Sequence, residues 1–206
     1  MSRAFLRLVR DRRASSTAEF ALVLPVLILF LLGMIDAGRL MWTWNKAEKA
    51  TQMGVRYAVA TDMVPTGLQN YSFVVTGGLT QGDAIPAGSF GSVTCTSTSC
   101  TCAGSNCPAV WTSAPNMAAF NAIVARMQRF LPELTAAGVQ VSYANSGLGY
   151  AGDPNGPDVA PLVTVSLRPD TVVFRPITFA LFRTTINLPS FSAALTMEDG
   201  QGSVAN

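Results

Sequence analysis

The stretch FALVLPVLILFLLGMI, residues Phe20–Ile35, decides the architecture of this chain, because it places sixteen uncharged residues in a row between Glu19 and Asp36. A helix rises about 1.5 Å per residue, so this run covers about 24 Å of a hydrocarbon core about 30 Å thick. Ala37 and Gly38 can extend it. We therefore predict a single transmembrane helix near the N-terminus.

Charges around the apolar run are asymmetric. Residues 1–14 carry five arginines and one aspartate, whereas the other residues carry nine basic and eleven acidic side chains. Because a basic flank stays in the cytoplasm, we expect the long remainder to be exported, with Trp42 and Trp44 at the outer membrane interface. The exported part keeps no basic stripe that would bind a phosphate backbone, so we expect no nucleic-acid partner.

Two other interpretations of the apolar run remain open. A buried core helix does not explain five arginines beside it. A secretory signal peptide needs small residues before a cleavage site, and the best site, after Ala37, has Ile35 and the acidic Asp36 before it. The signal-peptide interpretation also does not explain Glu19, an acidic residue directly before the apolar run.

The residues around the run form a recognisable pattern: RRASSTAEFALVLP at 12–25, GMIDAGRL at 33–40, NKA at 45–47 and GVRYA at 54–58. This pattern resembles the N-terminus of TadE-like proteins, the minor pseudopilins of the tight-adherence (Flp-type) pilus system. The resemblance implies cleavage by a prepilin peptidase five residues before the glutamate, between Ala14 and Ser15. The family usually has glycine before the cut, where this chain has Ala14.

The resemblance also gives roles to residues of the helix. Glu19 becomes the fifth residue of the mature chain, where its carboxylate can pair with an α-amino group and favour one register of assembly, because an unpaired charge at membrane depth is costly. A headgroup-level ion pair with Arg12 or Arg13 is the local alternative. Pro25 should kink the helix, although a tolerated transmembrane proline explains it equally well.

Beyond the membrane we expect the helix to continue, so that one helix runs from about 17 to 61. Ala50, Gly54 and Ala58 form a row of small residues on it that lets another backbone approach closely. The partner of this row is either the exported domain or a neighbouring helix.

The exported part is predicted to be α+β, a pilin-like domain with an antiparallel sheet and a second helix. The helix is capped by Ser113 or Asn116, has Pro115 in its first turn, and presents the apolar stripe Met117, Phe120, Val124, Met127 and Leu131. Strands are predicted from alternating or short apolar runs at 71–75, 90–95, 139–143, 163–167 and 186–197, with a loop at 145–161 and a turn or helix at 176–182.

These elements divide the chain into a basic cytoplasmic leader at 1–14, a transmembrane and stalk helix at 15–62, an extracytoplasmic domain at 63–200 and a flexible tail at 201–206. The expected location is the bacterial inner membrane, single-pass, with the N-terminus in the cytoplasm and the C-terminal domain periplasmic or extracellular.

Four cysteines, Cys95, Cys100, Cys102 and Cys107, lie within thirteen residues. An even count in an exported loop favours two disulfides. The pairing stays open between 95–100 with 102–107 and an arrangement in which 95–107 spans the others. A metal site is disfavoured, because the spacing lacks C-x2-C pairs and the chain has no histidine.

Residues for catalysis are scarce. Without histidine there is no Ser-His-Asp or Cys-His arrangement. The GDPNGPD motif, with Asp153, Asn155 and Asp158, resembles part of a calcium loop but lacks its late glutamate, so a turn between strands is favoured. We expect no enzymatic activity, cofactor, metal or small-molecule substrate.

The function favoured by the sequence is that of a minor pseudopilin, or pilus assembly protein, of a Tad pilus. Its partners would be the inner membrane, other pilus subunits, the secretion machinery and a prepilin peptidase. The alternative is a membrane-anchored binding module that uses the cysteine loop outside any fibre.

Overall fold

The computed structural model describes residues 15–178, 183–198 and 200–203, with side chains from Thr17 onward. The chain divides into two units. The anchor unit comprises the chain up to Thr43 together with Phe174–Ile186, and the sheet domain comprises Trp44–Val173 together with the chain from Asn187.

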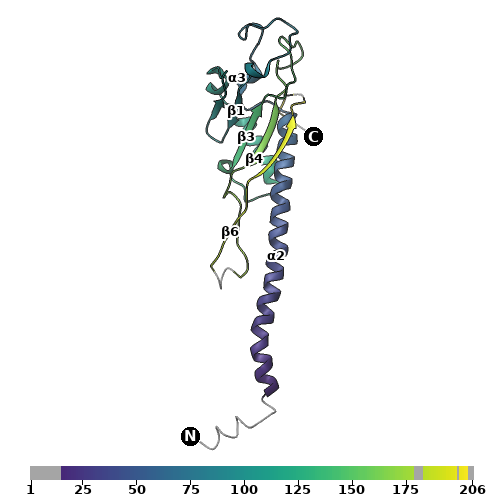
Figure 1. Ribbon diagram of the computed structural model, residues 1–206, viewed down its shortest axis with the longest axis vertical. Coiled ribbons are helices and arrows are strands. Elements are labelled where there is room, and N and C mark those ends of the chain that lie inside the picture. Colours follow the sequence, from purple (N-terminus) through teal and green to yellow (C-terminus); the bar gives the residue numbers. More distant parts are fainter. Residues whose placement is uncertain (1–14, 179–182, 199, 204–206) are drawn as a thin grey trace, which may run out of the picture. The chain divides into compact units, whose positions relative to one another are not determined.

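The first described element is a single long helix, α2, which spans Ser15–Val59 and includes Pro25 (Figure 1). Its ends lie within two residues of the predicted limits of about 17 and 61. In the described part of the chain this is the helix that is long and apolar enough to cross a membrane, with a mean hydropathy of 2.5 in its most apolar window.

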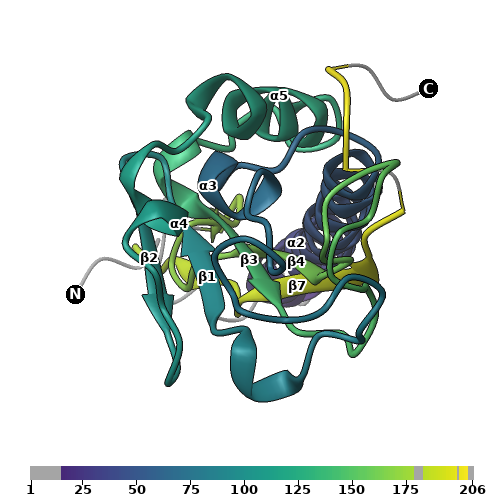
Figure 2. The ribbon, with the colours of Figure 1, turned by 90° about the horizontal axis from the view of Figure 1, so that it is seen from above.

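The sheet domain is built on a five-stranded antiparallel sheet, which confirms the predicted α+β class. Its order is β2 (Cys100–Ala103), β1 (Ser92–Cys95), β3 (Val139–Ala144), β4 (Leu162–Leu167) and β7 (Phe191–Thr196). Figure 2 shows these strands in this order. The predicted strands at 90–95, 139–143 and 163–167 are therefore present.

Strand register explains why one face of the sheet is buried. Val141 of β3 is paired with Cys95 on one side and Val165 on the other, and all three side chains are fully buried. Because paired residues of antiparallel strands point to the same face, the alternating apolar positions form continuous rows across the sheet.

Helix α5 (Met117–Gln128) supplies the second predicted helix, and Asn116 caps it by accepting a hydrogen bond from the Ala119 N–H at 3.0 Å. The sequence left Ser113 as an alternative cap. Pro115 consequently precedes the cap and does not lie in the first turn. Leu131 is buried, although it follows the end of the helix. The shorter helical elements are α3 (Thr66–Gln69), α4 (Val110–Ser113), η1 (Ala87–Ser89) and η2 (Ala136–Gly138).

The prediction of a strand at Tyr71–Val75 is wrong. This segment forms turns. Tyr71 and Phe73 are buried as an alternating pattern predicts, but both pack into an aromatic cluster with Trp111. The backbone N–H of Phe73 donates to the carboxylate of Asp158 at 2.7 Å. This carboxylate therefore accepts the hydrogen bond that a neighbouring strand would otherwise have accepted.

Near the C-terminus, the predicted strand at 186–197 is divided in two. Its first part, β6 (Ile186–Asn187), pairs with β5 (Val173–Phe174) in a separate two-stranded sheet, and its second part is β7. Of the turn predicted at 176–182, Ile177 and Thr178 form a turn, and residues 179–182 lie outside the described residues.

Candidate membrane and assembly surface

The apolar run of α2 is exposed. Its large apolar side chains have exposed fractions from 38% at Leu24 to 77% at Leu22, apart from the half-buried Leu32. None of the most apolar window is buried within the protein. This excludes the interpretation of the run as a core helix, because core helices bury most of their apolar side chains. An exposed apolar helix of this length is suited to lipid or to other apolar helices.

The residues predicted for processing lie at the start of α2. Ser15 is the first residue of the helix and Glu19, one turn later, has an exposed side chain. Ala14 lies outside the described residues, as do the arginines that precede it. Pro25 is inside the helix, six residues after Glu19.

The C-terminal part of α2 has a different environment. Ala50 and Ala58 are fully buried, and Gly54 lies between them on the same side of the helix. A Cβ atom added at Gly54 would lie 2.7 Å from Cγ of Met127 in α5 and 3.2 Å from Cγ1 of Val165 in β4. The row of small residues therefore packs against the sheet domain of the same chain. This domain was one of the two partners that the sequence predicted for the row.

Asp36 makes several defined contacts within the anchor unit, and sequence reasoning gave it no role. Its Oδ1 accepts the backbone N–H of Ile177 at 2.6 Å and Nη1 of Arg39 at 3.1 Å. Its Oδ2 accepts the backbone N–H and the hydroxyl of Thr178, each at 3.0 Å. An acid directly after an apolar run and three residues before an arginine was a signal for such a site. Its main partners, however, are 141 and 142 residues away in the sequence.

Arg39 links the same segments a second time, since its guanidinium carbon lies 5.4 Å from the centre of the Phe174 ring. Cation–π contacts of this geometry contribute about 0.5–1 kcal/mol when exposed. The contact with Phe174 holds this part of the chain against α2, whereas the bond between Arg39 and Asp36 lies within the helix.

The two tryptophans expected at the outer membrane interface differ. Trp42 has an exposed fraction of 69%. Trp44 instead packs edge-to-face on Phe191 of β7, with ring centres 5.0 Å apart. Trp42 alone of the two therefore presents most of its ring to the surroundings.

Disulfides join Cys95 to Cys100 and Cys102 to Cys107. This is the first of the two pairings that the sequence left open. Cys95 and Cys100 are directly paired residues of β1 and β2. Gly91 allows the second bridge to lie close to β1, because a Cβ there would be 2.9 Å from Sγ of Cys107. The bridges hold together a hairpin that has few apolar residues to bury.

The GDPNGPD motif forms a turn around Asp158, which is buried and accepts the backbone N–H groups of Phe73 and Asp153 at 2.7 and 3.1 Å. Its carboxylate thus organises two loops. Among the described residues no group of three or more His, Cys, Asp or Glu side chains is placed to hold a metal ion.

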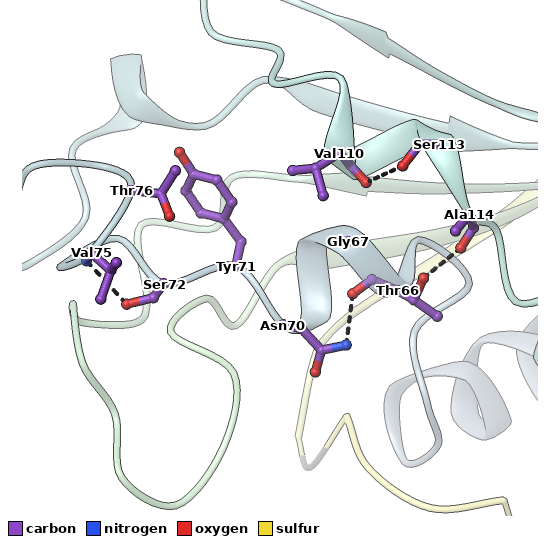
Figure 3. A pocket seen from close by; sticks show the side chains of 10 residues that line it. All are labelled: Thr66, Gly67, Asn70, Tyr71, Ser72, Val75, Thr76, Val110, Ser113 and Ala114. Carbon is purple, nitrogen blue, oxygen red and sulfur yellow. Dashed lines mark hydrogen bonds between the residues drawn. The ribbon is translucent and has the colours of Figure 1, made fainter.

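A cleft of about 610 Å³ opens in the sheet domain between α3, α4 and the turn at 72–76 (Figure 3). The polar groups drawn there are mostly bonded to the backbone: the Thr66 hydroxyl donates to the Ala114 carbonyl, and the Asn70 amide donates to the Thr66 carbonyl at 3.1 Å. The lining contains no acidic or basic side chain.

Comparison with known proteins gives a match that covers most of helix α2. Residues 14–56 match the family model described as TadE-like protein. Neither the comparison with curated proteins nor the comparison with solved structures gives a match. The matched region contains Glu19, Pro25, Asp36 and Gly54, and it ends just before α2 does. The resemblance predicted from the sequence is thereby confirmed: this chain begins with a TadE-like segment, which supports a protein associated with a Tad pilus system.

Proposed function

We propose that this chain is a minor pseudopilin of a Tad pilus, which acts structurally by packing its N-terminal helix against other subunits. The proposal rests on a difference in exposure between the N-terminal and C-terminal parts of α2. Its apolar part is exposed and bears the TadE-like pattern, whereas Ala47, Ala50 and Ala58 are buried in the chain's own domain. The first part is therefore available for intermolecular packing and the second is not.

In this proposal the chain is inserted with its arginine-rich leader, residues 1–14, in the cytoplasm and its domain outside the inner membrane. A prepilin peptidase then cuts between Ala14 and Ser15. Glu19 pairs with an α-amino group of its own or a neighbouring chain, because a carboxylate at the membrane boundary is stabilised by an opposite charge. The mature chain binds membrane, pilus subunits and secretion machinery, and no catalysis is involved.

The mature N-terminus of the chain purified from its own host tests the processing step. A pseudopilin should begin at Ser15. A chain that begins near Gly38 would instead show a cleaved signal peptide, and one that begins at Met1 would show a membrane-anchored module that is not processed.

Replacement of Glu19 tests the assembly step. Glu19→Ala should still insert into the membrane, but less of it should be recovered with pili, because the pairing that selects the register is lost. Glu48→Ala is the matched control, since Glu48 is an exposed acid on the same helix. Equal recovery of Glu19→Ala and Glu48→Ala with pili would contradict the role of Glu19.

A further inference from the structure

The contacts of Asp36 show that a second part of the chain lies at the C-terminal end of the apolar run. Four donors surround its carboxylate, and three of them belong to Ile177 and Thr178. The side chain of Asp36 is 9% exposed in its pair with Arg39. Residues 174–178 and 183–186, together called the docked segment, belong to the same unit as this part of the helix.

The depth of Asp36 follows from the length of the run. Sixteen residues at about 1.5 Å each span about 24 Å, so a carboxylate directly after them lies within a few ångströms of the boundary of a hydrocarbon core about 30 Å thick. A charged group at this depth is costly unless it is hydrogen-bonded. Ile177 and Thr178 of the docked segment supply those bonds, and since the bonds are 2.6–3.0 Å long, these two residues must lie at the same depth as Asp36.

The composition of the docked segment suits this depth. Ile177 and Ile186 keep exposed fractions of 46% and 45% although both are apolar. Arg175 and Arg183 are exposed, and the sequence from 174 to 186 contains no acidic residue. Apolar side chains that enter the acyl boundary, combined with arginines that reach the phosphate headgroups, are the pattern of interfacial membrane-binding segments.

We propose that the docked segment is a second membrane contact, which inserts Ile177 and Ile186 into the outer boundary of the bilayer beside α2 and binds anionic headgroups through Arg175 and Arg183. Asp36 acts as the positioning residue, because its carboxylate holds the backbone of Ile177 and Thr178. The chain is thus attached to the membrane by a helix and by an interfacial segment from the far end of its sequence. This attachment does not depend on leader removal or on entry into a pilus.

Fluorescence quenching in vesicles tests this proposal. The full chain carries an environment-sensitive fluorescent amino acid at position 177, and in a second preparation at position 148. Leu148 is the matched control, an exposed apolar residue of the sheet domain with an exposed fraction of 58%. Both preparations are reconstituted at low density in phosphatidylcholine and phosphatidylglycerol vesicles whose lipids carry a nitroxide quencher near the carbonyl end of the acyl chain.

We expect a large loss of fluorescence at position 177 and little at position 148. Asp36→Asn should reduce the loss at 177, since a side-chain amide cannot accept at both of its terminal atoms. Asp62→Asn should leave it unchanged, although Asp62 also accepts a backbone N–H, that of Gly202 at 2.8 Å.

Equal quenching at positions 177 and 148 would overturn the proposal, and would leave the docked segment as a surface for water or for a neighbouring subunit. Unchanged quenching at 177 in Asp36→Asn would overturn the positioning role of Asp36. The wild-type comparison of the two labelled positions stands even if the Asp36 variant does not fold.

Discussion

Substitution of Gly54 tests whether the TadE-like helix is built into its own domain. A Cβ at this position would lie 2.7 and 2.9 Å from Cγ and Sδ of Met127, and 3.2 Å from Cγ1 of Val165. Contacts below 3.0 Å require a neighbour to move. Met127 is flexible and can give way to one methyl group, but not to a larger side chain.

The magnitude follows from two opposing effects. Overpacking a core costs about 1–3 kcal/mol, while replacing glycine in a helix gains about 1 kcal/mol. Gly54→Ala should therefore lower the free energy of unfolding by about 1 kcal/mol. Gly54→Leu adds three more carbons against Met127 and Val165 and should lower it by about 2 kcal/mol or more. For a domain of this size that corresponds to a fall in Tm of about 4–8 °C.

The assay is thermal unfolding of the chain in detergent, followed by near-ultraviolet circular dichroism. This signal reports the aromatic cluster of Tyr71, Phe73, Phe90 and Trp111 in the sheet domain, and is insensitive to helix that persists in detergent. Gly38→Ala is the matched control, because no atom lies within 4 Å of a Cβ added there, and it should not lower Tm. A Gly54→Leu variant with the Tm of the wild type would refute the packing of α2 on α5 and β4.

Two further predictions concern the sheet domain. Tyr143→Phe removes the hydroxyl that accepts the Val64 N–H at 3.1 Å, and leaving that buried N–H unpaired should cost about 1–3 kcal/mol in urea unfolding. Burial raises the pKa of Tyr143. The stability that its hydroxyl contributes is therefore complete below the unfolded pKa of about 10 and is lost as the pH rises above that value. The wild type should consequently lose more stability than Tyr143→Phe between neutral and strongly alkaline pH, and parallel pH profiles of the two proteins would contradict this. Alkylation without reductant should label no cysteine by mass spectrometry, whereas four labelled thiols would contradict the disulfides and bring back a thiolate metal site.

Local patterns in the sequence were sufficient for several elements. Sixteen uncharged residues predict the long helix because hydropathy and length are local properties. Period-two alternation at 139–143 and 163–167 predicts two strands for the same reason. The α5 helix was recognisable from its apolar stripe and from Asn116, which bonds to a residue only three positions away. The TadE-like pattern was likewise contained in one continuous stretch.

Tertiary structure alone decided the features that depend on residues distant in sequence. The alternation at Tyr71–Val75 is typical of a strand, but the carboxylate of Asp158, 85 residues away, takes the N–H of Phe73 that a strand would have paired. The sheet order, and the partner of the small-residue row, depend on which apolar faces meet when the chain is compact.

Asp36 shows the same limit at the candidate site. Its sequence neighbours show that Asp36 directly follows an apolar run, and they therefore predict a charge near a membrane boundary. They do not predict any binding partner for its carboxylate. Its hydrogen-bond partners are backbone N–H groups, which every residue except proline carries, so no side-chain pattern at 174–178 marks them. The sequence by itself therefore determined that this protein has a long apolar helix with an acid at each end of its apolar run. Only the fold decided that Asp36 accepts hydrogen bonds from Ile177 and Thr178, because a contact between residues 141 and 142 positions apart leaves no local pattern in the sequence.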